Sequence, residues 1–289
     1  VARGNVMKVI GDEDESELFL KKIREVEKYC EEFNSLSEDV ILDIIKGKAP
    51  VITKQENLII HGMNGKPIVA RTENQQRLVK AFEENDLVFA TGPAGTGKTF
   101  VAIALAVKAL KNKEIRKIIL SRPAVEAGEK LGFLPGEMKD KLDPYLQPLY
   151  DALQDMVPGA KLKEYMELNI IQIAPLAFMR GRTLNDAIVI LDEAQNTTTQ
   201  QIKMFLTRMG INTKMIVTGD MTQIDLPSSQ TSGLVQAIKI LKGVKGISFI
   251  ELNKKDIVRH KLVTRIVEAY EKFEEKTKSL KNTDKPSLQ

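Results

Sequence analysis

One stretch of eight residues contains the residue types that hold a phosphate group. Residues 92–99 read GPAGTGKT and match the pattern G-x-x-x-x-G-K-S/T, after an apolar strand (LVFA) and before an apolar helix (FVAIALAVKAL). Glycines let the backbone curl so that amide hydrogens point at phosphate oxygens, and the helix dipole adds to this attraction. The residues that we expect to contact a nucleotide are Gly92, Pro93, Ala94, Gly95, Thr96, Gly97, Lys98 and Thr99.

Two of these side chains have specific expected roles. In this pattern Lys98 neutralises the β- and γ-phosphates, and the hydroxyl of Thr99 binds Mg²⁺. A glycine-rich turn with a surface lysine is the alternative, but the flanking strand and helix favour a nucleotide site. We therefore predict that the chain binds a nucleotide together with Mg²⁺.

The sequence AIVILDEAQN, residues 187–196, could add the acids that hydrolysis requires. Its apolar start predicts a buried strand that ends at Asp192, which places this carboxylate beside residues 92–99. Asp192 would hold Mg²⁺ through its water shell, and Glu193 would orient and deprotonate the attacking water. An Asp-Glu pair alone indicates only a strand end that reaches solvent. Together with the phosphate-binding stretch, it favours hydrolysis.

A third strand ends in a similar way. MIVTGDMTQ, residues 215–223, has Gly219 where the chain must turn. Polar residues at the carboxyl ends of strands face the ligand crevice in open α/β sheets. Asp220 or Gln223 could therefore respond to the γ-phosphate. An ordinary Gly-Asp turn is the alternative, and only the other two stretches favour the functional interpretation.

These three stretches require a sheet that brings several strand ends together. Aliphatic and β-branched runs predict strands, and helical patterns lie between them. This alternation favours an α/β fold, a doubly wound and mostly parallel sheet with right-handed crossovers. The predicted strands are residues 87–90, 117–120, 170–174, 187–191, 214–218 and 247–251.

The rest of the chain divides into smaller parts. The chain begins at Val1 without a methionine, so we expect its first element to be cut off. Asn64 and Gly65 are a strong signal for a β-hairpin, which leads into a helix over residues 73–84. The predicted parts are a small α/β element (1–48), a linker with the hairpin (49–72), the main domain (73–272) and a polar, disordered tail (273–289).

Composition and charge narrow the class of protein. Of 289 residues, 43% are hydrophobic and 28% charged, as in soluble globular proteins, and no apolar run approaches the roughly 20 residues of a membrane span. The single cysteine, Cys30, fits a reducing cytoplasm. The net charge is +4, but residues 1–60 carry −4 and residues 238–289 carry +6. The basic end could attract nucleic acid phosphates, although charge alone favours a solvated surface.

The three stretches together resemble the nucleotide motifs of superfamily-one helicases. Residues 120–153, with residues 179–198 and 256–271, are more specific and closely resemble the PhoH-like family of bacterial ATPases. The resemblance covers roughly residues 60–272. It implies a three-layer, RecA-like P-loop ATPase domain, a cytoplasmic location and a role in RNA metabolism. Residues 1–48 resemble the latter part of the KH-like region that precedes the core in fuller members, without a GxxG loop.

The resemblance to helicases also implies roles for further residues. By position, Gln75 matches a glutamine that reads adenine. Ser121 and Arg122 match a turn that contacts the backbone of single-stranded nucleic acid. Helicases of this type close the ATP site with an arginine from a second domain, for which the 70 residues after Gly219 are too few. A neighbouring subunit would then supply the arginine, in a homo-oligomer that we expect to be a hexameric ring.

Arg259 is our first candidate for this arginine in trans, with Arg182 and Arg265 behind it. For any single one of them a surface or ion-pair arginine is the simpler interpretation. The complete prediction is a Mg²⁺-dependent ATPase that couples ATP hydrolysis to work on single-stranded RNA. Two alternatives stay open: an ATP-dependent scaffold or regulator with little turnover, acting on a partner such as an RNA nuclease, and a P-loop kinase.

Overall fold

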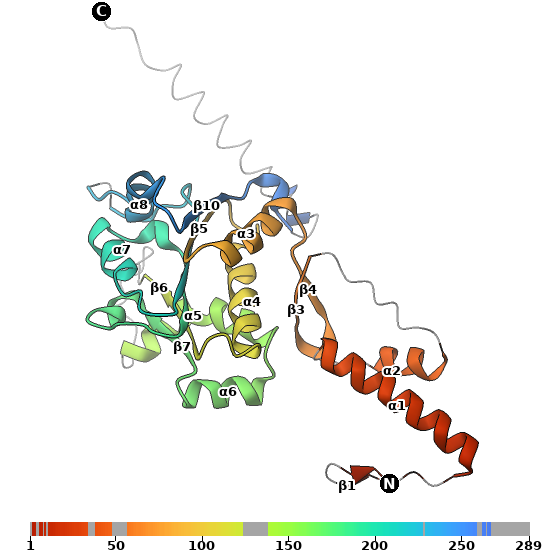
Figure 1. Cartoon of the computed structure of the whole chain (residues 1–289). Helices are drawn as coiled ribbons and strands as arrows, with labels where there is room; N and C mark the ends of the chain where they lie inside the picture. The colour runs from red at the N-terminus through yellow and green to blue at the C-terminus, as the bar shows by residue number, and fades with distance from the viewer. Residues whose placement is uncertain are drawn as a thin grey trace, which may run out of the picture.

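Six parallel strands form the central sheet of the computed structural model, in the order β10-β5-β9-β8-β6-β7 (Figure 1). Every pairing within this sheet is parallel, which confirms the predicted α/β fold. All six predicted strands are present, with small shifts at their ends. They are β5 (Leu87–Thr91), β6 (Lys117–Arg122), β7 (Ile171–Pro175), β8 (Ala187–Leu191), β9 (Lys214–Gly219) and β10 (Ile247–Glu251).

The structure describes residues 2–3, 6–7, 9, 11–33, 38–47, 57–123, 138–227, 229–258, 262–263 and 265–266. Predictions about the tail at residues 273–289, and about Arg259, lie outside this part of the chain. Among the described helices, none is both long enough and apolar enough to cross a membrane.

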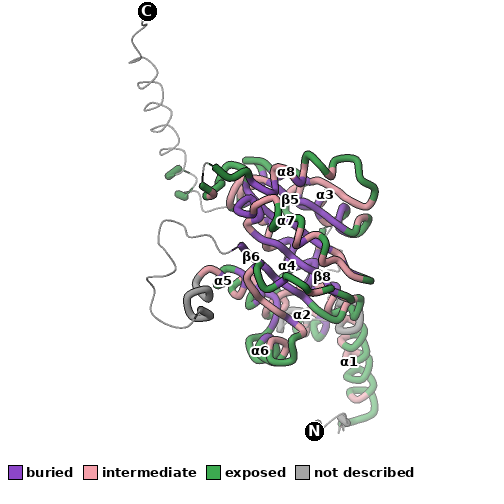
Figure 2. The backbone as a smooth tube through the Cα atoms, turned by 90° about the vertical axis from the view of Figure 1, so that its left-hand side faces the viewer, coloured by how far each residue is buried: buried purple, intermediate pink, exposed green. Residues whose placement is uncertain are grey.

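Helices cover both faces of the sheet, which gives three layers. One face packs against α3 (Glu73–Glu84), α4 (Lys98–Lys111), α5 (Met138–Gln154) and α6 (Gly159–Glu167). The other packs against α7 (Thr199–Leu206), α8 (Gly233–Leu241) and the short helix η3 (Leu176–Met179). Figure 2 shows the buried strands between helices that are exposed on their outer sides.

The alternation of side chains along each strand builds two separate cores from continuous apolar runs. In β5, Val88 and Ala90 belong to the core on the α4 side, whereas Leu87 and Phe89 belong to the core on the α7 side. Phe89 stacks on Phe249 of the neighbouring β10, with ring centroids 5.0 Å apart. A strand buried on both faces reads as continuously apolar, which is why the sequence pattern identified these strands.

The predicted hairpin is confirmed and packs beside the core. Strands β3 (Leu58–His61) and β4 (Pro67–Val69) pair antiparallel around the short helix η1 (Met63–Gly65), where Asn64 and Gly65 have positive φ angles. Lys111, at the end of α4, donates to the backbone oxygen of His61 at 3.1 Å. The hairpin is thereby held against the helix that follows the phosphate-binding stretch.

The described amino-terminal residues form two helices and a minimal two-stranded ladder. The elements are β1 (Ala2–Arg3), β2 (Val6–Met7), α1 (Glu13–Phe33) and α2 (Glu38–Ile45). Both helices lie within the small α/β element predicted for residues 1–48. The strand β2 lies within the same element, and its pairing with β1 was not predicted. The KH-like interpretation of residues 1–48 stays a prediction.

Candidate nucleotide-binding site

Residues 92–97 form a tight loop between β5 and the first residue of α4. Gly92 and Gly97 have φ angles of +147° and +80°, which a side chain would rarely adopt. A Cβ atom on Gly92 would also collide with the backbone oxygen of Leu252, and one on Gly97 would lie 2.9 Å from the amide nitrogen of Gln75. The loop is therefore both curled and closely packed, as a phosphate-binding loop must be.

Lys98 directs its ammonium group back into this loop. Its Nζ atom donates to the backbone oxygens of Gly92 at 2.6 Å and Pro93 at 2.9 Å, and the residue is 9% exposed. The hydroxyl of Thr96 donates to the same Pro93 oxygen at 2.9 Å. A positive charge thus lies at the mouth of the curled backbone, where the amide hydrogens and the start of α4 favour an anion.

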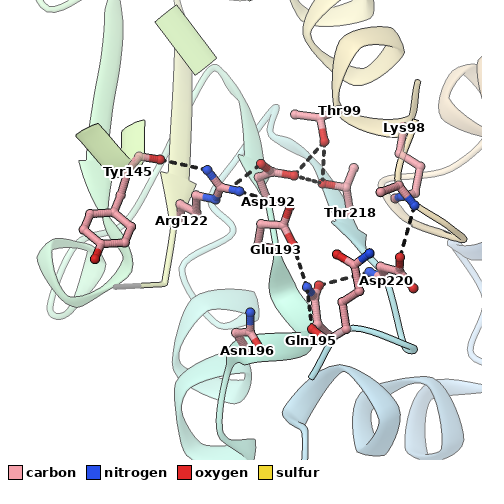
Figure 3. Close-up of polar contacts among 12 residues, drawn as sticks. Lys98, Thr99, Arg122, Tyr145, Asp192, Glu193, Gln195, Asn196, Thr218 and Asp220 are labelled. Atoms are coloured by element: carbon pink, nitrogen blue, oxygen red, sulfur yellow. Dashed lines mark hydrogen bonds and ion pairs between the residues drawn. The ribbon is translucent and has the colours of Figure 1, made fainter. Parts of the chain in front are cut away.

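Asp192 and Thr99 meet although 93 residues separate them in sequence (Figure 3). The Thr99 hydroxyl donates to Asp192 Oδ1 at 2.6 Å, and the Thr218 hydroxyl donates to the same oxygen at 2.8 Å. Strand order explains this meeting, because β9 lies between β5 and β8. A hydroxyl and a carboxylate at this separation are the oxygen ligands that Mg²⁺ takes alongside phosphates and water. The residues present therefore fit a magnesium ion.

Glu193 lies beside Asp192 but turns toward β6 instead of the loop (Figure 3). Its backbone is left-handed, with φ 52° and ψ 38°. Oε1 accepts a hydrogen bond from Arg122 Nη2 at 3.0 Å, and Oε2 accepts one from Gln195 Nε2 at 2.5 Å. Arg122 also places Nε 3.7 Å from Asp192 Oδ2 and donates through Nη1 to the Tyr145 backbone oxygen at 2.8 Å. One guanidinium therefore bridges both acids.

The turn after β9 is tied to the loop through Asp220. This carboxylate, 4% exposed, accepts hydrogen bonds from the backbone nitrogen of Ala94 at 3.1 Å and from Thr222. The Asp220 backbone nitrogen donates to Gln195 Oε1 at 3.0 Å, and Gln195 Nε2 also donates to the Gln223 backbone oxygen at 3.2 Å. The side chain of Gln223 itself is exposed. Asp220 thus contacts the loop directly, whereas Gln223 lies at its rim.

Residues from all three sequence stretches line one cavity of about 240 Å³, which we call the phosphate cleft. It contains most of the predicted phosphate, metal and catalytic residues from both the loop and the strand ends. The cleft is lined by Ala94, Gly95, Gly97, Lys98, Thr99, Phe100, Asp192, Glu193, Gly219, Asp220 and Gln223.

A second cavity of about 290 Å³, the hairpin pocket, shares Gly95, Gly97 and Phe100 with the phosphate cleft. Gln75 forms part of its wall, but both ends of its amide are already bonded. Nε2 donates to the Thr96 backbone oxygen at 2.9 Å, and Oε1 accepts from the Arg71 backbone nitrogen at 2.7 Å. Gln75 therefore supports the loop, and its reading of adenine stays a prediction. The other lining residues are Met63, Lys66, Pro67, Ile68, Val69, Arg71, Val101, Asp155 and Val258.

The two predicted nucleic-acid contacts differ in accessibility. Ser121 is completely buried, and its hydroxyl has no hydrogen-bond partner. In this conformation the hydroxyl therefore cannot reach a nucleic acid, although the Ser121 backbone oxygen accepts from the Asp192 nitrogen at 2.8 Å. Arg122 keeps 21% of its side chain exposed while it holds the two acids. Of the pair, only Arg122 can meet a phosphate from solvent.

Of the arginine candidates that the structure describes, Arg182 and Arg265 line neither cavity. Arg182 lies before β8, at the edge of the sheet opposite the phosphate cleft, and donates to Gln172 Oε1 at 2.7 Å. Arg265 is exposed. Arg259 is outside the described residues, but Val258 before it donates its backbone hydrogen to the Gly95 oxygen at 3.1 Å. A role for any of them in a neighbouring subunit stays a prediction.

Gln195 and Thr218 are site residues that the sequence analysis missed. Gln195, 1% exposed, links Glu193 to the turn at Asp220, and Thr218 shares an oxygen of Asp192 with Thr99. A signal existed for both, since Gln195 follows the two acids in DEAQN and Thr218 is the polar residue at the end of an apolar strand. Their partners, however, depend on which strands are neighbours.

The fold and the phosphate cleft define a P-loop protein of the nucleoside-triphosphate-binding class. Within that class, the family model described as "PhoH-like protein" matches residues 67–271, and the chain belongs to this family. It is 52% identical to a PhoH-like protein of Bacillus subtilis over 277 residues, which are 94% of this chain and 87% of that one. A Mycobacterium tuberculosis PhoH-like protein is 48% identical over 281 residues, covering 94% and 79%.

Similarity to solved structures is weaker. The Pif1 helicase of Candida albicans aligns with a TM-score of 0.37 and 14% identity, over 70% of this chain and 43% of that one. An alignment at this level supports no conclusion about function. The assignment to the PhoH-like family, and the geometry of the cleft, therefore carry the functional argument.

Proposed function

We propose that this chain is a Mg²⁺-dependent ATPase that couples hydrolysis to the binding or remodelling of single-stranded RNA. One observation carries the ATPase part: the Thr99 hydroxyl and the Asp192 carboxylate meet at 2.6 Å in the cleft that Lys98 and Glu193 also line. Thr99 and Asp192 would hold Mg²⁺, which would supply positive charge to offset that of the β- and γ-phosphates. Glu193 would take a proton from the attacking water while the water oxygen bonds to the γ-phosphorus and ADP leaves.

The hairpin pocket is where we place the nucleoside. It adjoins the phosphate cleft through Gly95 and Gly97, and the side chains of Ile68, Val69 and Phe100 give it apolar walls for a base. The phosphate-binding loop forms one side of this pocket, and Gln75 supports the loop through its hydrogen bond to Thr96. This arrangement supports a nucleotide that spans both cavities around the loop, with ATP as the proposed ligand.

RNA, the assembly and the location are further parts of the proposal. Support for RNA comes from the family resemblance and from the basic end of the chain, residues 238–289, with a net charge of +6. We propose a cytoplasmic homo-oligomer, a hexameric ring in which one subunit supplies an arginine to the next, and an RNA nuclease as a possible partner. Among the residues that the structure describes, we propose that Arg122 contacts a phosphate of the RNA backbone.

A second candidate, a nucleotide-dependent scaffold with little turnover, is favoured by one observation. Both carboxylate oxygens of Glu193 already accept hydrogen bonds, from Arg122 and from Gln195. A base held in this way hydrolyses ATP slowly unless something releases it. The two candidates therefore differ in whether RNA raises the turnover.

The test is ATP turnover by the purified chain with and without single-stranded polyuridylate, alongside Glu193→Gln and Glu251→Gln. RNA should raise wild-type turnover, and Glu193→Gln should bind ATP with unchanged affinity but lose about 10²–10⁴-fold in turnover, as expected when a general base is removed. Glu251 also ends a strand of the sheet but is exposed and outside the cleft, so its variant should match wild type.

Each part can fail separately. Turnover retained by Glu193→Gln would exclude Glu193 as the base. Tight ATP binding with negligible turnover, with or without RNA, would favour the scaffold. Transfer of phosphate to a small molecule instead of water would point to a kinase.

A further inference from the structure

Strand β6 lies next to β8, the strand that precedes Asp192 and Glu193, and it ends at Arg122. Arg122 does not belong to any of the three nucleotide-binding stretches. β6 pairs with β8 in parallel, with Ser121 opposite Leu191, so that Arg122 and Asp192 follow at the same edge of the sheet. Ile118 and Leu120 of β6 lie in the core on the α4 side, and alternation sends Arg122 to that side as well. This is the side from which Thr99 reaches Asp192. The guanidinium therefore meets both acids because of strand order and register.

Arg122 and Gln195 each donate a hydrogen bond to the carboxylate of Glu193. The Nη2 atom of Arg122 is 3.0 Å from Oε1 of Glu193, while Gln195 bonds the other oxygen at 2.5 Å. A base must present a lone pair to a water at the γ-phosphate, and here each oxygen already accepts a hydrogen bond that holds the carboxylate in its present direction. The left-handed backbone of Glu193 is costly for a non-glycine residue, and such strain persists where surrounding contacts hold it.

The contact is also one that a phosphate could displace. Arg122 bonds Glu193 through a single nitrogen, and its Nε atom is 3.7 Å from Asp192, beyond hydrogen-bond distance. The side chains of Arg122 and Glu193 are 21% and 34% exposed, so solvent weakens their attraction. A guanidinium binds a phosphate through two parallel hydrogen bonds, which is the stronger arrangement. A phosphate that arrives from solvent can therefore compete with Glu193.

Arg122 lies away from the phosphate-binding loop, so a phosphate that binds its guanidinium does not have to occupy the nucleotide site. The loop follows β5, and β9 and β8 lie between β5 and β6. At about 4.8 Å per strand, the end of β6 lies roughly 14 Å from the end of β5. Arg122 does not line the phosphate cleft, whereas Glu193 does. A polyanion at Arg122 can thus act on the cleft through Glu193 without occupying it.

We propose that Arg122 is a positioning residue that restrains Glu193 and releases it when a phosphate oxyanion binds the guanidinium. The inference rests on the proposed ATPase function, and it deepens that function by naming the link between the two ligands. The phosphate of an RNA backbone is the source that the exposed position of Arg122 favours. The γ-phosphate of the bound nucleotide is the other source, and the experiment separates the two.

The test compares steady-state ATP hydrolysis by wild type, Arg122→Gln and Arg122→Lys, with and without polyuridylate. Arg122→Gln should raise the RNA-free kcat by about three- to tenfold, the effect of one charge-assisted hydrogen bond at a partly exposed site. Its KM for ATP should stay within about twofold, because Arg122 does not line the cleft. RNA should give no further stimulation. Arg122→Lys keeps one charged donor and should restore most of the restraint.

Three controls connect the effect to Glu193. The double variant Arg122→Gln, Glu193→Gln should hydrolyse ATP as slowly as Glu193→Gln alone. Arg116→Gln, at an exposed residue immediately before the same strand, should behave as wild type. Equilibrium binding of a fluorescent, non-hydrolysable ATP analogue should be unchanged in Arg122→Gln, which also shows that the variant is folded.

An RNA-free kcat of Arg122→Gln at or below the wild-type value would overturn the proposal, even if RNA stimulates the wild type. Arg122 would then hold Glu193 in a productive position. A raised kcat in Arg122→Gln, with a wild type that RNA does not stimulate, would support the restraint. In that case the RNA part of the proposed function fails, and the nucleotide is the source of the phosphate.

Discussion

Asp192 carries two hydroxyl hydrogen bonds on one oxygen, from Thr99 and Thr218, and faces the guanidinium of Arg122 with the other. The two hydroxyls fix the orientation of the carboxylate before any metal binds. In other metal sites, the loss of a partner that orients a ligand lowers metal affinity or activity by about 10–100-fold. At the residue scale, therefore, the negative charge of Asp192 and its fixed direction are the properties that matter for Mg²⁺.

The substitution Asp192→Asn removes the negative charge of this side chain but keeps its shape. The amide can still accept from Thr99, so the fold should be kept, while the half-saturating Mg²⁺ concentration for ATP hydrolysis should rise by about 10–100-fold. A titration of Mg²⁺ at fixed ATP measures this shift. Asp225→Asn is the control, because Asp225 lies in the segment after β9, is exposed and does not line the cleft. An unchanged Mg²⁺ requirement in Asp192→Asn would remove Asp192 from the metal site.

Residue types and spacing were sufficient to predict the phosphate-binding loop and the approach of Thr99 to Asp192, because each belongs to a local pattern with a known partner. The hydrogen bonds from Arg122 and Gln195 to Glu193 were not predictable in this way. The first depends on β6 lying beside β8, and the second on the tight local turn that follows β8. Periodicity predicts a strand and its two faces, but it does not say which strand is its neighbour.

At the scale of elements, the short helix η5 (Lys254–Asp256) ties the end of the sheet to the loop. Asp256, 2% exposed, accepts from the backbone nitrogen of Asn253 at 2.7 Å and from Asn74 Nδ2, in α3, at 2.9 Å. Two residues later Val258 bonds the Gly95 oxygen at 3.1 Å. The segment after β10 thus links α3, the hairpin pocket and the phosphate-binding loop.

The pKa of Asp256 makes this link sensitive to acid. Burial by itself would raise that pKa, but hydrogen bonds from Thr72, Asn253 and Asn74 outweigh it, and the pKa is lowered. A carboxyl whose pKa is lower in the folded state stabilises the fold above its unfolded pKa of about 3.9. That stabilisation is lost as the pH falls from this value through the folded pKa.

Asp256→Asn should therefore lower the free energy of unfolding near pH 7 by about 1–3 kcal/mol, the range for hydrogen bonds to a buried charged group. The difference from wild type should shrink as the pH falls below about 4. Urea unfolding at several pH values measures both curves. Asp151→Asn, at an exposed carboxylate on α5, is the control and should follow wild type. A difference that stays constant down to low pH would contradict the role of the Asp256 charge.

At the scale of the whole molecule, the cleft lies at the carboxyl edge of the sheet, and Arg182 lies at the opposite edge. An arginine at the opposite edge cannot reach the cleft of its own chain, but in a ring it could face the cleft of a neighbour. If an arginine completes the site, the position of Arg182 away from the cleft directs the search to a neighbouring subunit. An arginine supplied in trans raises turnover by about 10³–10⁵-fold in P-loop enzymes.

Mixing of two inactive variants tests this arrangement directly. Lys98→Ala should lose nucleotide binding, and Arg259→Ala should bind ATP but hydrolyse it slowly if Arg259 acts in trans. When the two are mixed, activity should return at interfaces where an intact cleft meets an intact Arg259. The same mixture with Arg182→Ala or Arg265→Ala identifies the residue if Arg259 is not the one. Fully active monomers in sedimentation would contradict a shared site, because no neighbour would then be present to complete it.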